Sequence, residues 1–278
     1  MSEKIKSFKP SRQVRHESFH EGTVHHRLRY LAEETALEII INGLSYSLLM
    51  QTPGQEAELV TGFLYTEGLI DAPSQIGSLT IQKGAGILGM NGVEARVRLP
   101  ELESRDALPE RISFSLSSCG LCGKESLDQI GRGIERVKSR QHFSWETISG
   151  LLTDLRRRQP LYEQTKGVHA AAVYEADGSF VCCFEDVGRH NALDKVIGYC
   201  LRHDVIFHDK LVVLSGRASL EMILKTARAG MPLFLCFSSP TTLAIEAAKS
   251  LNITLVGREK DRTLAAYTHT RRLELKPE

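Results

Sequence analysis

Residues 211–256 read LVVLSGRASLEMILKTARAGMPLFLCFSSPTTLAIEAAKSLNITLV. Three apolar runs in this stretch, Leu211–Leu214, Leu233–Phe237 and Thr254–Val256, have the length of buried strands. Segments with helical spacing, Leu220–Ala229 and Thr241–Leu251, lie between them. Strands that alternate with helices predict an α/β fold whose sheet is largely parallel.

The same pattern extends toward the N-terminus. Val168–Tyr174 and Phe180–Phe184 are predicted to pair around the Asp177-Gly178 turn, and helices are predicted at Trp145–Arg157 and Asn191–Arg202. We therefore assign residues 141–278 to one α/β domain. In sheets of this kind, ligands bind at the carboxyl ends of the strands.

Residues 1–110 are predicted to form a smaller, β-rich α+β region. Its first 30 residues are polar and basic, and we expect a flexible or edge-strand arm there. A hairpin is predicted around Asn42-Gly43, a helix over Glu56–Leu69 and strands within 77–99. Residues 111–140 are assigned to a cysteine loop and a following helix over 125–139. The predicted apolar face of that helix holds Leu127, Ile130, Ile134 and Val137.

Composition excludes several classes of protein. Hydrophobic residues make up 42% and charged residues 25% of the 278 residues, which is typical of a globular protein. Lys and Arg number 35 against 34 Asp and Glu, so the net charge of +1 argues against a nucleic-acid scaffold. Because no apolar run reaches the ~18–20 residues that span a bilayer, we expect no membrane insertion and a cytoplasmic location.

The sharpest local feature is Cys119-Gly120-Leu121-Cys122. This spacing fits half of a zinc site, a redox pair or a sulfur-carrying nucleophile. The flanking glycines and Lys124 favour an accessible thiolate, because the positive charge stabilises it. The adjacent Cys182 and Cys183 are predicted to point to opposite faces of a strand. Apolar neighbours place two further cysteines in the core, Cys200 and Cys236.

Turns rich in Gly, Ser and Arg follow the predicted strands. They are Glu185–Asn191, Ser215–Ser219 and Ser238–Thr241, and the segment Arg258–Arg262 follows a further strand. Helix N-termini with such residues bind phosphate groups. Several of these turns at one sheet edge predict a cradle for a nucleotide-bearing ligand, although each turn alone also suits an ordinary helix cap. His190, taken alone, is more typical of a structural hydrogen-bonding residue.

Taken together, these motifs make the chain resemble the formate dehydrogenase accessory sulfurtransferases, the FdhD family, over nearly its whole length. The motifs that carry the resemblance are Leu37-Glu38-Ile39, Asn42-Gly43, Thr52-Pro53-Gly54, Gly62-Phe63-Leu64 with Glu67-Gly68, Ser118–Gly123, Gly167-Val168-His169, Glu185–Ala192 with Asp194-Lys195, Ser215-Gly216-Arg217 and Ser238–Thr241. Several long motifs in one order are far more specific than an isolated Cys-x-x-Cys.

The resemblance implies a sulfurtransferase that carries sulfane sulfur as a cysteine persulfide. The donor would be a cysteine desulfurase of the IscS type. The acceptor would be the molybdenum bis-(molybdopterin guanine dinucleotide) cofactor, bound as cargo and required by formate dehydrogenase. The resemblance makes Cys119 the carrier, with Cys122 either assisting it or sharing the sulfur, and implies a homodimer with a cytidine-deaminase-like layered fold.

The cofactor contacts that follow from the resemblance and from the strand-end turns form one set. They are Arg217, Ser238, Ser239, Arg258, Glu259, Lys260, Asp261, Arg262 and Thr263. No metal ligand of the protein itself is assigned. The segment Val256–Tyr267 is longer than the short turn usual in the family. The last six contacts, residues 258–263, fall within this longer segment.

Two other functions stay open at this point. A zinc nucleoside deaminase needs a His-x-Glu or Cys-x-Glu segment before a Pro-Cys-x-x-Cys pair. Here Ser118 replaces the proline, and His169 follows the cysteines without the glutamate that would transfer protons. The other alternative is a zinc-stabilised chaperone that assists cofactor insertion without sulfur transfer.

Overall fold

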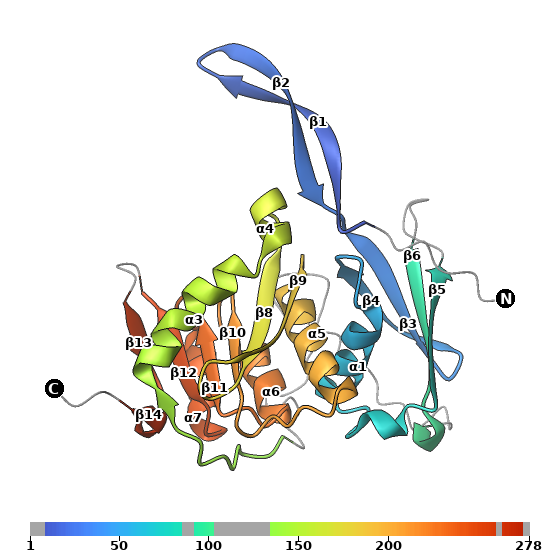
Figure 1. Ribbon diagram of the computed structural model, residues 1–278. Coiled ribbons are helices and arrows are strands. Elements are labelled where there is room, and N and C mark those ends of the chain that lie inside the picture. Colours follow the sequence, from blue (N-terminus) through green and yellow to red (C-terminus); the bar gives the residue numbers. More distant parts are fainter. Residues whose placement is uncertain (1–8, 85–91, 103–133, 260–262, 275–278) are drawn as a thin grey trace.

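The computed structural model describes residues 9–84, 92–102, 134–259 and 263–274. Two sheets stand side by side with helices packed between them, and a two-stranded ribbon projects from the body (Figure 1). The fold is a mixed α/β fold, as predicted from the alternating strands and helices. Within the described ranges, no helix is long and apolar enough to cross a bilayer.

The larger sheet has six strands in the order β13-β12-β11-β10-β8-β9. They are β8 (His169–Tyr174), β9 (Phe180–Asp186), β10 (Leu211–Leu214), β11 (Leu233–Cys236), β12 (Thr254–Arg258) and β13 (Leu264–Ala266). Strands β10, β11 and β12 are parallel to one another, whereas β8, β9 and β13 pair antiparallel with their neighbours.

The prediction of a largely parallel sheet is therefore wrong outside the central three strands, whereas the predicted pairing of β8 with β9 around the Asp177-Gly178 turn is confirmed. The physical reason is the length of the connections. β8 and β9 are joined through the tight Asp177-Gly178 turn, in which Gly178 has φ of 89°. A short turn joins only antiparallel strands, because a parallel pair needs a longer crossover.

Helices cover both faces of this sheet. On one face α5 (Arg189–Arg202), α6 (Leu220–Arg228) and α7 (Thr242–Ser250) bury a core with Val212 and Leu214. On the other face α3 (Trp145–Arg157) packs on Leu211 and Val213. The alternation along β10 follows from the two-residue period of a strand. The remaining short elements are α4 (Pro160–Thr165), β7 (Phe143–Ser144), β14 (Leu273–Glu274), η1 (Pro73–Gln75), η2 (Pro100–Leu102) and η4 (Thr270–Arg272).

The smaller sheet has four strands in the order β4-β3-β6-β5. They are β3 (Thr35–Ile41), β4 (Leu44–Gln51), β5 (Ser78–Gly84) and β6 (Gly92–Arg98), and α1 (Glu56–Thr66) packs against them. The hairpin predicted at Asn42-Gly43 is confirmed, with positive φ at both residues. The N-terminal arm forms β1 (Ser11–His20) and β2 (Thr23–Ala32). The division of the chain at residues 110 and 140, and the cytidine-deaminase-like layering, stay predictions.

The helix predicted over 125–139 is wrong in its last turns. Residues 134–139 form neither a helix nor a strand, and 125–133 lie outside the described residues. The Val137 amide donates to the Leu251 carbonyl at 2.9 Å, and Asn252 Nδ2 donates to the Val137 carbonyl at 2.7 Å. The apolar spacing places Val137 in the core, where it is buried. Its backbone, however, forms hydrogen bonds with residues at the end of α7 and not within a helix of its own.

The two sheets are joined where α1 crosses α5. A Cβ atom built on Gly62 would lie 1.9 Å from the Asp194 carbonyl oxygen, and one built on Gly198 would lie 1.8 Å from that of Glu58. Backbone therefore meets backbone at this crossing, and no flexible side chain is available to yield. Only glycine fits at either position.

We predict that Gly198→Ala destabilises the protein by more than about 3 kcal/mol, because a backbone clash relaxes only if the helices separate. Gly150→Ala in α3 is the matched control. Gly150 also lies within a helix, but an added Cβ meets nothing within 4 Å. We expect Gly150→Ala to stabilise by about 0.5–1 kcal/mol through helix propensity. Denaturant unfolding measures both changes, and equal effects would contradict the crossing described above.

Candidate functional site

The carboxyl ends of β10, β11 and β12 bring three turns to one edge of the larger sheet. The Phe237 amide donates to the Leu214 carbonyl at 3.1 Å, which ties the second turn to the first. A Cβ atom built on Gly257 would lie 3.2 Å from the Ser238 carbonyl oxygen. The end of β12 therefore also lies close to the second turn. Open α/β sheets bind ligands at such an edge.

Two arginines gather around one aromatic ring at this edge. The guanidinium carbons of Arg156 and Arg258 lie 5.6 Å and 6.0 Å from the centre of the Phe237 ring. Arg156 comes from the end of α3 and also lies 5.2 Å from the Tyr162 ring. Two cations beside one apolar ring favour a planar or anionic ligand, because it satisfies the guanidinium donors and reduces their mutual repulsion.

The N-termini of α5 and α6 add a second polar group beside Gly216. A Cβ atom on Gly216 would lie 3.4 Å from both Arg189 Cδ and His169 Nδ1. His190 forms an ion pair with Glu221. Burial would raise the pKa of Glu221, but the hydrogen bond from His190 and nearby positive charges lower it overall.

The pKa of His169 is lowered, whereas a solvated imidazole beside a carboxylate has a raised pKa. Burial lowers its pKa most, and the charge of Arg189 lowers it further. The neutral imidazole is therefore favoured, with a nitrogen beside the Gly216 turn. A neutral imidazole in this position can donate or accept a single hydrogen bond from a ligand at the sheet edge.

Glu185, Asp186 and Lys195 of the Glu185–Lys195 motif hold this edge in place, whereas Arg189 of the same motif lies beside Gly216. Asp186 and Lys195 form a fully buried ion pair at 2.7 Å. Asp186 also accepts from the Thr52 amide at 3.1 Å and from Asn191 Nδ2 at 2.9 Å, while Lys195 donates to the Thr52 carbonyl at 2.9 Å. Glu185 accepts from two amides at the start of α4. The motif thus clamps the smaller sheet to the start of α5.

The structure places only part of the residues chosen from the sequence. Arg217, Ser238, Ser239 and Arg258 lie at the carboxyl edge. Glu259 and Thr263 face each other across the β12–β13 hairpin, where the Glu259 amide donates to the Thr263 carbonyl at 2.8 Å. The predicted site residues Cys119, Cys122, Lys260, Asp261 and Arg262 lie outside the described residues.

Sequence reasoning missed three residues that the fold brings to this edge: Arg156, His169 and Glu221. Arg189 lies in the predicted turn Glu185–Asn191, and His169 stood inside a quoted motif, which was the available signal. No local signal connects Arg156 with Phe237, because 81 positions of chain separate them.

The described cysteines are poor nucleophiles. Cys182 and Cys183 point to opposite faces of β9, as predicted, into the two cores of the larger sheet. Burial raises the pKa of Cys183 to about 12 and that of Cys236 to about 11. The pKa of Cys182 is also raised, first by its hydrogen bond with Cys200 and then by burial. Cys200 is buried in the same core, as predicted.

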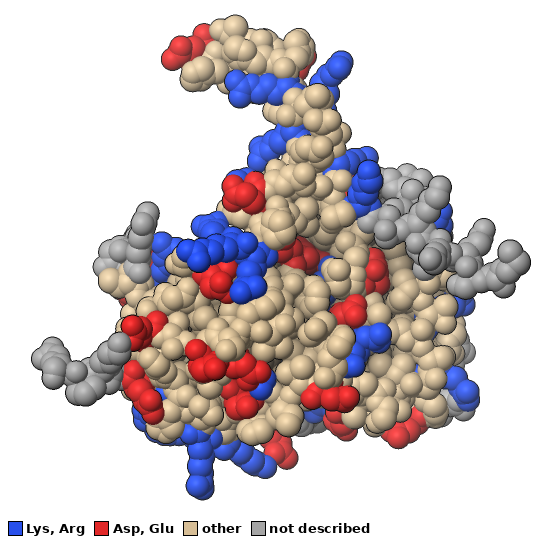
Figure 2. Space-filling view, in the orientation of Figure 1, with Lys and Arg blue, Asp and Glu red and all other residues tan. Residues whose placement is uncertain are grey.

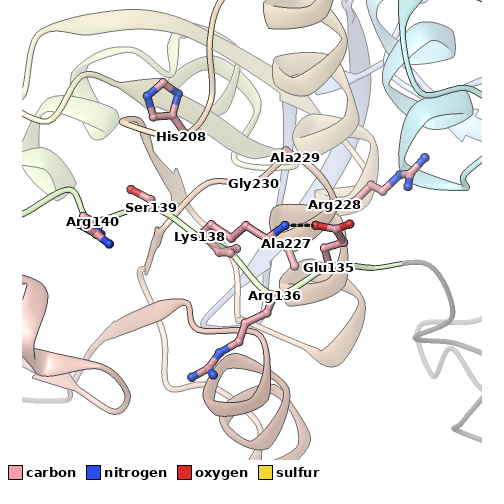
Figure 3. A pocket seen from close by; sticks show the side chains of 11 residues that line it. Glu135, Arg136, Lys138, Ser139, Arg140, His208, Ala227, Arg228, Ala229 and Gly230 are labelled. Carbon is pink, nitrogen blue, oxygen red and sulfur yellow. Dashed lines mark hydrogen bonds and ion pairs between the residues drawn. The ribbon is translucent and has the colours of Figure 1, made fainter.

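A cavity of about 640 Å³ lies at the opposite edge of the sheet, where α6 ends (Figure 3). Its charged side chains do not converge on a common point (Figure 3). Lys138 is paired with Glu135 at 2.7 Å, and Arg228 donates to the Ile70 carbonyl and to Asp71. This cavity is therefore a weaker candidate than the carboxyl edge.

Comparison with known proteins identifies relatives over most of the chain. Residues 32–274 match the sequence model of the FdhD/NarQ family. The sulfur carrier protein FdhD of Nocardia farcinica is 36% identical over 249 residues, which covers 87% of this chain and 88% of that protein. That of Streptomyces coelicolor is 34% identical over 267 residues, which covers 92% and 93%. A crystal structure from Desulfotalea psychrophila, of a protein assigned as a formate dehydrogenase accessory protein, superposes with a TM-score of 0.74 at 22% identity. It covers 96% of this chain and all of that one, and it establishes a shared fold.

We predict that Arg189→Gln raises the pKa of His169 toward its ordinary value without reaching it, because burial persists after the charge is removed. Arg202→Gln, at the far end of α5, is the control and should leave His169 unchanged. Titration of the imidazole by NMR measures both. Since the folded pKa is lowered, stability is expected to fall as pH decreases below about 6.5, the unfolded value. That loss should be smaller in Arg189→Gln, and an unchanged His169 titration would contradict the assigned cause.

Proposed function

The chain belongs to the FdhD/NarQ family, and on that basis we propose that it carries sulfur for the maturation of formate dehydrogenase. It takes sulfane sulfur from a cysteine desulfurase of the IscS type. It passes that sulfur to the molybdenum bis-(molybdopterin guanine dinucleotide) cofactor, its cargo. We also propose that it works as a homodimer in the cytoplasm.

The observation that carries this proposal is the cluster of cations at the carboxyl edge. Arg156 and Arg258 flank Phe237, and the Ser238-Ser239 turn follows directly along the chain. The cargo has pyrophosphate groups and two guanine bases, which match guanidinium donors and an aromatic ring. Arg217 lies in the neighbouring Ser215–Ser219 turn. The family resemblance adds the segment Glu259–Thr263 to this cradle.

Cys119 is the proposed carrier, with Cys122 beside it in the chain. The four described cysteines support this choice. The hydrogen bond with Cys200 and then burial disfavour the thiolate of Cys182, burial disfavours that of Cys183 and Cys236, and Cys200 is enclosed in the core. The Cys119 thiolate attacks the terminal sulfur of the donor persulfide. An S–S bond forms to Cys119, the donor S–S bond breaks, and the donor cysteine leaves as a thiolate.

We predict that Cys119→Ala abolishes sulfur loading. Wild-type protein incubated with cysteine desulfurase and cysteine should gain about 32 Da, lost on reduction, for the one sulfur atom that exchange adds. Cys183→Ser is the matched control, because Cys183 is half-buried with a pKa near 12, and it should still gain the sulfur. Intact-mass measurement with peptide mapping reads out both. Stoichiometric zinc with no sulfur gain would instead establish the zinc-stabilised chaperone.

We predict that Arg258→Ala weakens the binding of guanosine diphosphate, used as a probe for the nucleotide end of the cargo, by about tenfold. A charge-assisted hydrogen bond contributes about 1.5–3 kcal/mol, which is at least that factor. Arg157→Ala is the control, because Arg157 is an exposed neighbour of Arg156 on α3. Isothermal calorimetry measures both affinities, and an unchanged affinity in Arg258→Ala would remove Arg258 from the cradle.

A further inference from the structure

The β1–β2 ribbon stands apart from the hydrophobic cores of the two larger sheets. It leaves the body as two strands of ten residues each, joined at Glu21-Gly22 (Figure 1). Large apolar side chains are exposed along it: Phe19, Val24, Leu28, Tyr30 and Leu31. None of them belongs to a described hydrophobic cluster. Because a two-stranded hairpin is only marginally stable in water, this surface favours a partner that covers it.

The register separates the ribbon into two unlike faces. Gln13 pairs with Tyr30, Arg15 with Leu28 and Phe19 with Val24, so one face holds four of the five exposed apolar side chains, together with the Glu17–His26 ion pair. Val14 pairs with Arg29 and His16 with Arg27, so the other face is basic. The ten residues of that basic face include no Asp or Glu; they are Arg12, Val14, His16, Ser18, His20, Thr23, His25, Arg27, Arg29 and Leu31.

This charge pattern is unfavourable for the ribbon on its own. Directly opposed residues are the nearest neighbours across a ribbon, and none of the three arginines of this face has a carboxylate opposite it: Arg12 faces Leu31, Arg27 faces His16 and Arg29 faces Val14. Two residues of the face have an acidic partner within ion-pair distance among the described residues: Arg12 lies against Glu33 at the base of the ribbon, and His20 lies against Glu21 at its tip. An acidic surface would satisfy the remaining cations. The ribbon is thus complementary in charge to a partner with exposed carboxylates.

The base of the ribbon lies beside the carboxyl edge that holds the proposed cradle. Arg29, on the basic face, donates to the Thr165 carbonyl of α4 at 3.4 Å, and Ser11 Oγ donates to Gln164 at 2.8 Å. α4 leads directly into β8, whose first residue is His169. Arginine side chains lie along the ribbon, and further Lys and Arg side chains lie on the body beside it (Figure 2). A protein bound to the basic face is therefore held next to the cradle.

We propose that the β1–β2 ribbon is a docking arm for the cofactor-free enzyme that receives the cargo, a formate dehydrogenase apoprotein with an acidic strip beside an apolar patch. This inference rests on the proposed function. The cargo-receiving enzyme fits better than other occupants because it must meet the cradle in order to take the cofactor from it. The basic face steers the encounter, and the apolar face supplies the surface that must leave water.

The test uses the full chain and a purified, cofactor-free formate dehydrogenase from the same cell. Arg27→Glu/Arg29→Glu reverses two charges of the basic face. Lys138→Glu/Lys249→Glu is the matched control, because both lysines are exposed and ion-paired with a nearby glutamate at the opposite edge of the sheet. Surface plasmon resonance measures association at about 0.05 M and about 0.3 M salt. Phe19→Ser/Leu28→Ser tests the apolar face.

We expect the wild-type affinity to fall steeply with salt, and Arg27→Glu/Arg29→Glu to weaken binding by about tenfold or more at low salt. The control should stay within about twofold, and the apolar variant should weaken binding while keeping the salt dependence. Unfolding curves and guanosine diphosphate affinity should match the wild type in all variants. If wild-type protein binds no guanosine diphosphate and gains no sulfur, the proposed function fails independently of the arm.

Three results would overturn the docking arm. The first is a charge-reversed variant that binds the apoenzyme like the control. The second is a charge-reversed variant that no longer binds cysteine desulfurase but still binds the apoenzyme, which would assign the ribbon to the sulfur donor. The third is a change in oligomeric state on light scattering without a change in apoenzyme binding, which would make a second copy of this chain the occupant.

Discussion

The contact between the backbones of α1 and α5 is the constraint on which the rest of the structure depends. Gly62 and Gly198 allow the two helices to touch without intervening side chains. The buried Asp186–Lys195 pair lies at the start of α5 and binds both polar groups of the Thr52 backbone. Isolated buried charges are costly, so this pair persists because the surrounding hydrogen bonds satisfy it. Together the two contacts fix the smaller sheet relative to the edge where β10, β11 and β12 end.

A rigid edge suits the chemistry that the site is proposed to perform. A large anionic cargo binds best where guanidinium groups are already oriented, because less order has to be imposed on binding. Phe237 orients two of them, and Glu185 holds the α4 start that carries Tyr162 close to Arg156. The same fold encloses Cys182, Cys200 and Cys236 in its core. Thiol chemistry is thereby kept away from the cysteines that serve packing.

Local signals predicted most of the elements, since strand and helix periodicity is written into neighbouring residues. The strand at Leu211–Leu214 and the turn at Asn42-Gly43 were predicted for this reason. Interactions between distant segments could not be predicted in this way. The apolar spacing that includes Val137 suits a helix, yet its amide pairs with Leu251. Likewise, Arg156 carries no mark of a site until folding places it beside Phe237. The predicted Asp177-Gly178 turn already implied one antiparallel pair, but the antiparallel placement of β8 beside β10 joins segments that are distant along the chain.

The helix crossing also has a consequence for how the chain folds during synthesis. α1 ends at Thr66, but the surface that receives it is not complete until α5 has left the ribosome, more than a hundred residues later. Domains generally fold as units once their parts have emerged. Until then, the face of α1 that carries Gly62 is not covered by α5, and the nascent chain exposes a surface that is prone to aggregation. The N-terminal sheet is therefore expected to depend on molecular chaperones until its second half has been translated.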